Sequence, residues 1–245
     1  VTAADIREGS NWQVISDDTN RAGRFRAVVG DFTNINTFDK LDQGFDEIYM
    51  LAAVVGVNRT LKFPQDVIRI NTQLTMNTLD WVARNPVKRI LFASSSENYA
   101  GTSDLFGTEI PTPETVPLCI GDVKHPRWAY AMTKMHGESA FIHSAEAYNY
   151  ECTVVRYQNI IGPEMGFGHA IPHIVERFVK SEESPFKIYG HDQTRAFCYI
   201  DDAVRGTVEA MESDAAAGEI YHIGNREEID MKILTTYIGE LMNYT

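Results

Sequence analysis

The sequence predicts an α/β fold in which helices cover both faces of a doubly wound parallel sheet. Short apolar runs rich in Val and Ile alternate with amphipathic helical stretches, and polar or turn residues bound each run. Strands that alternate with helices are typical of a parallel sheet buried on both faces. With 245 residues, 44% of them hydrophobic, the chain can build one large core, or one domain with a smaller appendage.

Five apolar runs predict strands of this sheet, and two long amphipathic stretches predict helices that cover it. The runs span residues 1–5, 25–31, 46–53, 88–96 and 151–157. The first helix is expected over 64–84, with Pro64 near its start and Pro86 just beyond its end. Its apolar face carries Val67, Ile70, Leu74 and Trp81. The second helix is expected over 128–148.

The alternation is looser after residue 160. Short strands are predicted at 186–190 and 219–224, and helices at 169–181, 201–213 and 230–242. No linker separates the two halves of the chain. We therefore expect a larger domain over 1–160 and a smaller, interleaved substrate-binding lobe over 161–245.

The start of the chain matches the end of a dinucleotide-binding fingerprint. That fingerprint is a strand, a Gly-rich turn, a helix, a second strand and an acid about 20 residues after the glycines. Asp5 supplies the acid, whereas no GxGxxG or GxxGxxG occurs. We expect the first strand and the Gly-rich turn to belong to a segment absent from this chain. The final GELMNYT stops as if within a domain, so the lobe is also expected to be incomplete.

Charge and cysteine content exclude several classes of partner. A net charge of −12 and a pI of about 5.0 disfavour nucleic acids and acidic membrane surfaces, although a local basic pocket for a small anion remains open. No apolar run approaches the roughly 20 residues of a membrane helix, and the start carries no secretory signal. The three cysteines lack metal-ligand or disulfide spacing, so we expect a reduced cytoplasmic compartment. We also expect no metal site, on the reading that the seven histidines include no i, i+4 ligand pair.

Tyr130 and Lys134 stand four residues apart in RWAYAMTK, so they share one face of the predicted helix. A nearby ammonium favours the phenolate, and we expect Lys134 to lower the pKa of Tyr130 from about 10 towards the working range. The phenol can then exchange a proton with a sugar hydroxyl, while Lys134 donates hydrogen bonds to the ribose hydroxyls of a cofactor. The alternative is an ordinary Tyr–Lys pair on the helix surface.

Three serines follow the buried run in LFASSSENYAG, residues 91–101. Their hydroxyls collect at the carboxyl end of a predicted strand, which is where ligands bind in open α/β sheets. A serine there can hydrogen-bond a substrate hydroxyl or carbonyl beside Tyr130. For this segment alone, a Ser-rich turn without function is the alternative.

Together these motifs resemble the extended short-chain dehydrogenase/reductase family, specifically its NAD-dependent nucleotide-sugar epimerases, dehydratases and decarboxylases. The resemblance covers nearly the whole chain in the family's order and implies a Rossmann-like fold. Residues 1–160 would form the NAD-binding domain and residues 161–245 the nucleotide-sugar-binding lobe. VTAAD is similar to the strand with the ribose-binding acid, here Asp5. VVGDF resembles the turn in which Asp31 meets the adenine, and MLAA resembles the strand end beneath the cofactor.

The resemblance also implies three groups of site residues. The catalytic residues are Ser95, Glu97, Tyr130 and Lys134. The NAD-binding residues are Asp5, Asp31, Phe32, Leu51, Ala52, Ala53, Asn71, Tyr130 and Lys134. The substrate-binding residues are Ser96, Asn159, Tyr189 and Arg195. RYQNIIGP and QTRAFCYIDD resemble the family segments that bind the substrate diphosphate.

Some of these residues carry a chemical argument of their own, each with an alternative. Asp5 at a strand end can accept both ribose hydroxyls, which favours NAD over NADP, although Arg7 weakens that preference and a helix N-cap is the alternative. Arg195 suits a diphosphate because its planar fork donates in pairs, and a surface ion pair with Asp201 is the alternative. Asn159 precedes a Gly-Pro pair and could instead serve a turn.

The chemistry that the family implies is a transient oxidation of the sugar at C4. Tyr130 removes the hydroxyl proton while hydride passes to NAD, and Ser95 holds the oxygen. The 4-keto sugar is then epimerised, loses water or, as a uronate, loses CO2. The pair Ser96-Glu97 stands where the dehydratases carry Asp-Glu, which disfavours a standard dehydratase because its acid position is a hydroxyl.

The same pair, with KHPRWAY and QTRAF, resembles the uronate decarboxylases. Against that, Asn98 and Ala100 replace the Val and Gly common in those enzymes, and GPEMGFGHAIP lacks their Arg. We therefore favour an epimerase and keep the decarboxylase and the 4,6-dehydratase as alternatives. A non-catalytic module that binds NAD or a nucleotide sugar is the alternative from another class. Family members often dimerise through two long helices, so a homodimer is expected.

Overall fold

The computed structural model of the protein describes residues 1–9, 12–17, 23–166, 168–180, 187–188 and 190–244. Its strands are β1 (Thr2–Asp5), β2 (Arg26–Val29), β3 (Glu47–Met50), β4 (Arg89–Ser95), β5 (Glu151–Tyr157), β6 (Asn159–Ile161), β7 (Thr194–Tyr199), β8 (Ile220–Ile223) and β9 (Glu228–Asp230). Its α-helices are α1 (Trp12–Asp17), α2 (Val57–Lys62), α3 (Pro64–Val82), α4 (Ala100–Phe106), α5 (Trp128–Tyr148), α6 (Ala170–Lys180), α7 (Ile200–Glu212) and α8 (Met231–Leu241). Short 3-10 helices span Ile35–Lys40, Ser96–Tyr99 and Asp214–Ala216.

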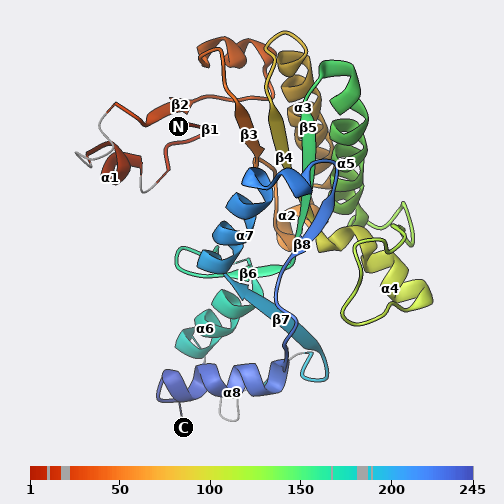
Figure 1. The fold of residues 1–245 in the computed structure, drawn as a ribbon. Coiled ribbons are helices and arrows are strands. Elements are labelled where there is room, and N and C mark those ends of the chain that lie inside the picture. Colours follow the sequence, from red (N-terminus) through yellow and green to blue (C-terminus); the bar gives the residue numbers. More distant parts are fainter. Residues whose placement is uncertain (10–11, 18–22, 167, 181–186, 189, 245) are drawn as a thin grey trace.

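The central sheet is parallel throughout, in the order β3-β4-β5-β8, with helices on both faces (Figure 1). Its middle strands are buried because alternate residues face opposite layers. Ile90 and Phe92 of β4 pack with residues of α3 and α5, whereas Leu91 packs with residues of β8 and α7. The predicted parallel sheet, covered on both faces, is thus confirmed.

β1 and β2 form a parallel ladder of their own, in which Asp5 lies opposite Val29. Among the described residues, no ladder joins this pair to the central sheet, and Figure 1 shows it beside β3. Side-chain contacts fasten the segment after β2 to α3 instead. The Asn77 amide donates hydrogen bonds to the carbonyl oxygens of Phe32 (2.9 Å) and Thr33 (2.8 Å). The expectation of a further strand ahead of residue 1 stays a prediction.

A second layer of structure lies beneath the carboxyl ends of the central strands (Figure 1). There β7 pairs in parallel with β6 and antiparallel with β9. α6 and α8 pack together through Ile174, Phe178 and Ile238. From the same half of the chain, β8 returns to pair with β5 in the central sheet. The predicted division into 1–160 and 161–245 stays a prediction.

The longer predicted elements are confirmed, with ends trimmed by a few residues. The strand predicted at 186–190 falls partly outside the described residues, and Lys187, Ile188 and Gly190, which are described, belong to no strand. The sequence reading missed the short elements α1, α2, α4, β6, β7 and β9 and the 3-10 helices. No helix in the described part of the chain is long and apolar enough to span a bilayer.

Candidate active site

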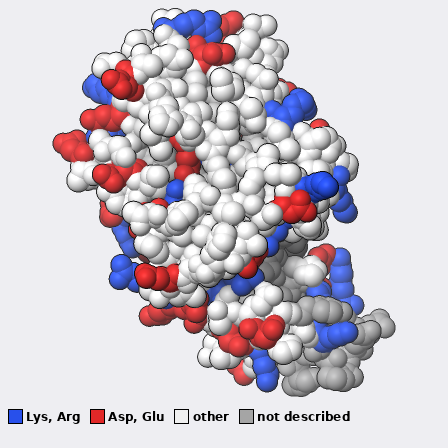
Figure 2. Space-filling model, turned by 90° about the vertical axis from the view of Figure 1, so that its right-hand side faces the viewer, with Lys and Arg blue, Asp and Glu red and all other residues white. Residues whose placement is uncertain are grey.

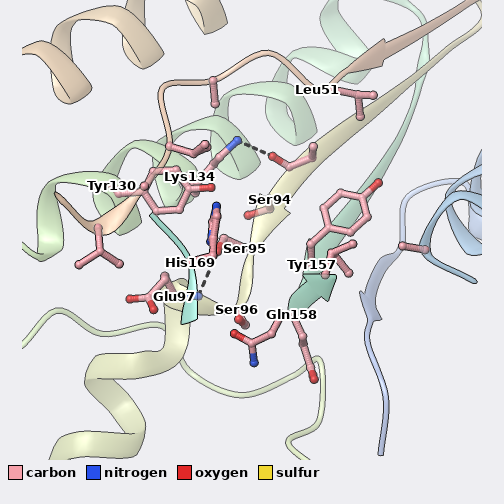
Figure 3. Close-up of a pocket in the computed structure, with 18 of the residues that line it drawn as sticks. Leu51, Ser94, Ser95, Ser96, Glu97, Tyr130, Lys134, Tyr157, Gln158 and His169 are labelled. Carbon is pink, nitrogen blue, oxygen red and sulfur yellow. Dashed lines mark hydrogen bonds between the residues drawn. The ribbon is translucent and has the colours of Figure 1, made fainter. Parts of the chain in front are cut away.

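A cavity of about 940 Å³ lies at the carboxyl ends of β3, β4 and β5. Its walls come from the loop after β3, the ends of β4 and β5, the start of α5 and one side of α7 (Figure 3). Most of the described residues in the wall are apolar, and a few polar side chains converge on one side. Such a composition is typical of a small-molecule site, and the carboxyl ends of parallel strands are its usual location.

The predicted catalytic residues all line this cavity: Ser95, Glu97, Tyr130 and Lys134. Leu51, Ala53, Ser96 and Asn159 line it as well. The fold therefore brings residues predicted from four separate segments of the sequence to one cavity. Other predicted residues lie elsewhere in the structure.

A close approach of α5 to β4 brings the predicted catalytic residues together. Gly137 makes this approach possible, because a Cβ atom there would lie 2.2 Å from the ring of Phe92 on β4. With α5 seated on the strand, Tyr130 and Lys134 lie beside the last residues of β4. The two side chains share a helix face, as their spacing predicts.

Lys134 is buried, and its Nζ atom donates a hydrogen bond of 2.6 Å to the carbonyl oxygen of Ala93 (Figure 3). The ammonium also lies 5.7 Å from the centre of the Tyr130 ring. The Ser95 side chain lies near enough to the phenol of Tyr130 to lower its pKa. Ser95 caps the turn that follows β4, where its Oγ accepts the backbone N–H of Glu97 at 3.3 Å. Strand, turn and helix are thus joined at one point.

The predicted lowering of the Tyr130 pKa is wrong in this structure. Burial raises the pKa of Tyr130 to about 12; the Ser95 side chain opposes that rise, and the charge of Glu97 adds to it. Burial also lowers the pKa of Lys134 from its ordinary 10.5 to about 8, against the opposing effect of Glu138. For Tyr130 the effect of burial outweighs that of Ser95, and for Lys134 it outweighs the attraction of Glu138. In both cases the charged form of the side chain loses its contact with water.

Glu97 sits at the rim of the cavity in an ion-pair cluster. Its Oε2 lies 3.7 Å from Nε of Arg127, and Nη1 of Arg127 lies 3.2 Å from Oδ2 of Asp104. The guanidinium of Arg127 also stacks 4.9 Å from the ring centre of Trp128. All three charged side chains are about half exposed, so the cluster orients Glu97 more than it stabilises the fold.

Asn71 does not line the cavity but fixes part of its wall. It is buried on α3, and its side chain pairs with the backbone of Val54: Oδ1 accepts the N–H at 2.7 Å, and Nδ2 donates to the carbonyl at 3.2 Å. Nδ2 also donates to Thr133 Oγ1 on α5 at 3.2 Å. The loop after β3, which includes Ala52 and supplies Leu51 and Ala53 to the wall, is held by this one amide.

The predicted adenosine-binding acids lie at the end of the separate β1–β2 ladder, Asp5 as the last residue of β1 and Asp31 two residues after β2. Asp5 is exposed at the end of β1, and its Oδ1 accepts the backbone N–H of Arg7 at 3.2 Å. Asp31 accepts both the N–H (2.9 Å) and the hydroxyl (2.7 Å) of Thr33, and these bonds lower the pKa of its carboxyl group. Phe32, predicted beside them, packs against Phe38 in the core. None of these residues lines the cavity among the described residues.

The predicted diphosphate-binding residues are only partly at the cavity. Asn159 lines it, and its Nδ2 donates to the carbonyl of Ala196 on the neighbouring strand at 3.0 Å. Arg195 is exposed on β7 outside the wall, and its guanidinium donates to Gln193 Oε1 at 2.8 Å rather than to Asp201. Tyr189 lies outside the described residues.

The sequence reading missed several cavity residues. Arg127 stands in KHPRWAY, one turn before Tyr130, and that spacing was an available signal. Gln158, just after β5, and His169, just before α6, also line the cavity (Figure 3). No pattern in the sequence predicts that these two residues lie there. The reading that no histidines have i, i+4 spacing is wrong, because His169 and His173 are four residues apart. No group of at least three potential metal ligands is found within the described residues.

Comparison with known proteins extends this picture. The model of the NAD dependent epimerase/dehydratase family matches residues 1–224. The chain is 32% identical to a UDP-N-acetyl-alpha-D-glucosaminuronate decarboxylase of Bacillus cytotoxicus, over 84% of this chain and 62% of that protein. It is 30% identical to a UDP-glucuronate 4-epimerase of Thermodesulfobacterium geofontis, over 80% of this chain and 57% of that protein. The chain therefore spans about three fifths of the length of these curated relatives.

Solved structures share the fold. A dTDP-glucose 4,6-dehydratase double mutant from Streptomyces venezuelae, with NAD and DAU bound, matches with a TM-score of 0.80 and 23% identity. That match covers all of this chain and 72% of the other. A UDP-glucuronic acid 4-epimerase from Bacillus cereus in complex with NAD matches at 0.77 with 22% identity, over 100% and 76% of the two chains. Since the family model covers most of the chain, the protein belongs to the NAD-dependent epimerase/dehydratase family of the extended short-chain dehydrogenases/reductases.

Proposed function

We propose that the protein is an NAD-dependent nucleotide-sugar epimerase that works through transient oxidation of the sugar at C4. The observation that carries this proposal is the grouping of Ser95, Tyr130 and Lys134 on one side of the cavity. It combines a hydrogen-bonding hydroxyl, a proton acceptor and a buried cation within a mostly apolar site. The curated relatives include an epimerase and a decarboxylase that act on nucleotide uronates, which agrees with this reaction class.

The residues present fit NAD. Leu51, Ala53 and Val55 offer an apolar wall, Lys134 supplies donors for ribose hydroxyls, and the exposed carboxylate of Asp5 suits the ribose of the adenosine half. When bound, NAD supplies the capacity to accept a hydride and return it. The proposed NAD contacts of Asp31, Phe32, Ala52 and Asn71 rest on the family resemblance.

Within this function, each catalytic side chain has one task. Tyr130, as phenolate, takes the proton of the sugar C4 hydroxyl. It returns this proton to the C4 oxygen after the 4-keto sugar has rotated to present its other face. Ser95 donates a hydrogen bond to that oxygen while it is a carbonyl. Lys134 holds positive charge beside the phenol, which favours the phenolate against the effect of burial. The apolar wall excludes water from the ketone.

Glu97 supports a second candidate reaction. It lines the cavity close to Tyr130, and elimination or loss of CO2 from a 4-keto sugar needs a further acid or base. A nucleotide-uronate decarboxylase is therefore the alternative that a specific residue favours, ahead of the 4,6-dehydratase. Ser96, Asn159, Tyr189 and Arg195 would hold the substrate diphosphate and sugar in each case.

We further propose a cytoplasmic homodimer that pairs α3 and α5 with their copies. Apolar and small residues surround α5 instead of forming a single stripe, as in helices covered on all sides. Figure 2 shows a broad face with few charged side chains over the upper part of the molecule. Ile68 and Met76 of α3 remain exposed in the single chain. Light scattering during gel filtration gives the mass, and a monomer at micromolar concentration would disprove the dimer.

One assay tests the main proposal. The protein is incubated with NAD and a panel of UDP-, GDP-, CDP- and dTDP-sugars that includes uronates, and products are separated by chromatography and weighed by mass spectrometry. An epimerase gives a product of unchanged mass and new retention time. Loss of CO2 or of water would replace the epimerase by the decarboxylase or the dehydratase, and NAD binding without any turnover would favour the non-catalytic module.

A further inference from the structure

A buried polar cluster lies directly behind the turn that carries Ser95, and among its members Ser94 also lines the cavity. It consists of Ser94, Asn98, Glu138 and Arg156, each at most 4% exposed. Glu138 and Arg156 form a bidentate ion pair, with 2.8 Å from Nε to Oε1 and 2.8 Å from Nη2 to Oε2. Removing two charges from water costs free energy that their attraction need not recover, so the pair is weak evidence of a contribution to stability. The other contacts of Glu138 indicate what else the pair does.

The carboxylate of Glu138 holds both ends of the turn that carries Ser95. Oε1 accepts the hydroxyl of Ser94 at 2.5 Å and the amide of Asn98 at 2.8 Å, and that amide also donates to Ser94 Oγ at 3.0 Å. Ser94 immediately precedes Ser95, and Asn98 immediately follows Glu97. The hydroxyl of Ser95 and the carboxylate of Glu97 therefore belong to a segment that is bonded to Glu138 through the residues on either side of it.

Three consecutive residues of β4 contact α5 at successive helical turns. The Ala93 carbonyl accepts from Lys134, Ser94 donates to Glu138, and Ser95 lies near Tyr130 and lowers its pKa. Tyr130, Lys134 and Glu138 are spaced by four residues and share one helix face. Glu138 is the innermost of the three and, unlike the others, lies outside the cavity wall formed by the described residues.

We infer that Glu138 is a positioning residue, which sets the placement of Ser95 against Tyr130 and Lys134 through Ser94 and Asn98. Arg156 orients the Glu138 carboxylate through its two hydrogen bonds, and is itself anchored to the carbonyl of Glu114 at 2.9 Å. The inference rests on the proposed function for its catalytic readout. A misplacement of about 1 Å at such a site can cost about 100-fold in rate.

The test compares Glu138→Gln with Glu146→Gln, the same change at an exposed position of α5. We expect Glu138→Gln to lower kcat about 100-fold with KM changed less than about threefold, and Glu146→Gln to change neither. The alkaline limb of the kcat–pH profile should also move to lower pH, because Lys134 loses a carboxylate that favours its charged form. Other titratable groups facing Glu138 are Arg156 and Cys152 of β5 and His222 of β8.

A double variant, Glu138→Gln with Arg156→Met, separates positioning from stability. It removes the unpaired buried guanidinium, so the urea midpoint should recover while kcat stays low. Recovery of kcat together with stability, or an unchanged kcat and pH limb in Glu138→Gln, would overturn the inference. A crystal structure of Glu138→Gln tests it without turnover: Ser95 should move relative to Tyr130, and an unmoved turn would overturn the inference. A wild type that converts no nucleotide sugar would instead refute the proposed function.

Discussion

The ammonium of Lys134 donates its 2.6 Å hydrogen bond to the backbone of Ala93, two residues before the serine that contacts Tyr130. The cation is thus tied to the same strand end as the hydroxyl that would hold the sugar oxygen. Because this bond is made by a backbone carbonyl, it does not depend on which side chain occupies position 93. The backbone of β4 therefore sets the position of the Lys134 ammonium relative to the Ser95 hydroxyl.

Replacing Tyr130 by Phe should lower kcat by about 1,000-fold, because the variant loses the group that accepts the C4 proton. Nucleotide-sugar binding, measured by calorimetry, should change little. Tyr148→Phe, at the far end of the same helix, is the matched control and should keep full activity. An unchanged conversion rate in Tyr130→Phe would exclude the proposed proton acceptor.

Lys134→Met should make the protein more stable near neutral pH while abolishing activity. The folded pKa of Lys134, about 8, lies below its ordinary 10.5, so the folded state binds fewer protons between these values and the buried ammonium costs stability below pH 8. That cost is about 3 kcal/mol, offset by about 1 kcal/mol for the lost hydrogen bond. We expect a net gain of roughly 1–2 kcal/mol in urea unfolding at pH 7, which shrinks towards pH 10.

The exposed Lys232, changed to Met, provides the control for that comparison and should alter stability by less than about 0.5 kcal/mol. A loss of stability at pH 7 in Lys134→Met would mean that its contacts outweigh the cost of desolvation.

Glu97→Gln should separate the epimerase from its alternatives. An epimerase needs no second acid or base, so kcat for C4 inversion should stay within about fivefold, whereas a decarboxylase should lose about 100-fold or more. The charge of Glu97 raises the pKa of Tyr130, so its removal should move the acid limb of the kcat/KM profile to lower pH. Glu109→Gln, in the exposed loop after α4, should leave both quantities unchanged.

Asn71→Ala should destabilise the fold by about 2 kcal/mol, because it leaves the N–H and carbonyl of Val54 without their partner. KM for NAD should rise as the wall around Leu51 and Ala53 loosens. Urea unfolding and NAD titration measure the two effects, with the exposed Asn58→Ala as control. A rise in KM without any loss of stability would indicate direct contact with the cofactor.

The sequence predicted the long elements, and it selected residues that line one cavity, because both depend on local spacing. The apolar run 88–96 and the four-residue separation of Tyr130 and Lys134 are visible without the fold. The pKa of Tyr130 was predicted in the wrong direction because spacing shows a neighbouring charge but not the burial that outweighs it. Glu138 and Arg156 were missed because their pairing joins α5 to β5, which no local pattern records.

The place of α7 has a mechanical consequence for access to the cavity. One side of this helix lines the cavity through Ala203, Val204 and Thr207, while Ala203 and Met211 pack in the core with β4 and β5. The hydroxyls of Thr207 and Tyr157 also lie 2.6 Å apart, which links α7 to β5. Swinging this wall outward would break these core contacts. On the proposed function, a nucleotide sugar would therefore enter past the loops at the cavity rim and reorient beside a wall that does not move.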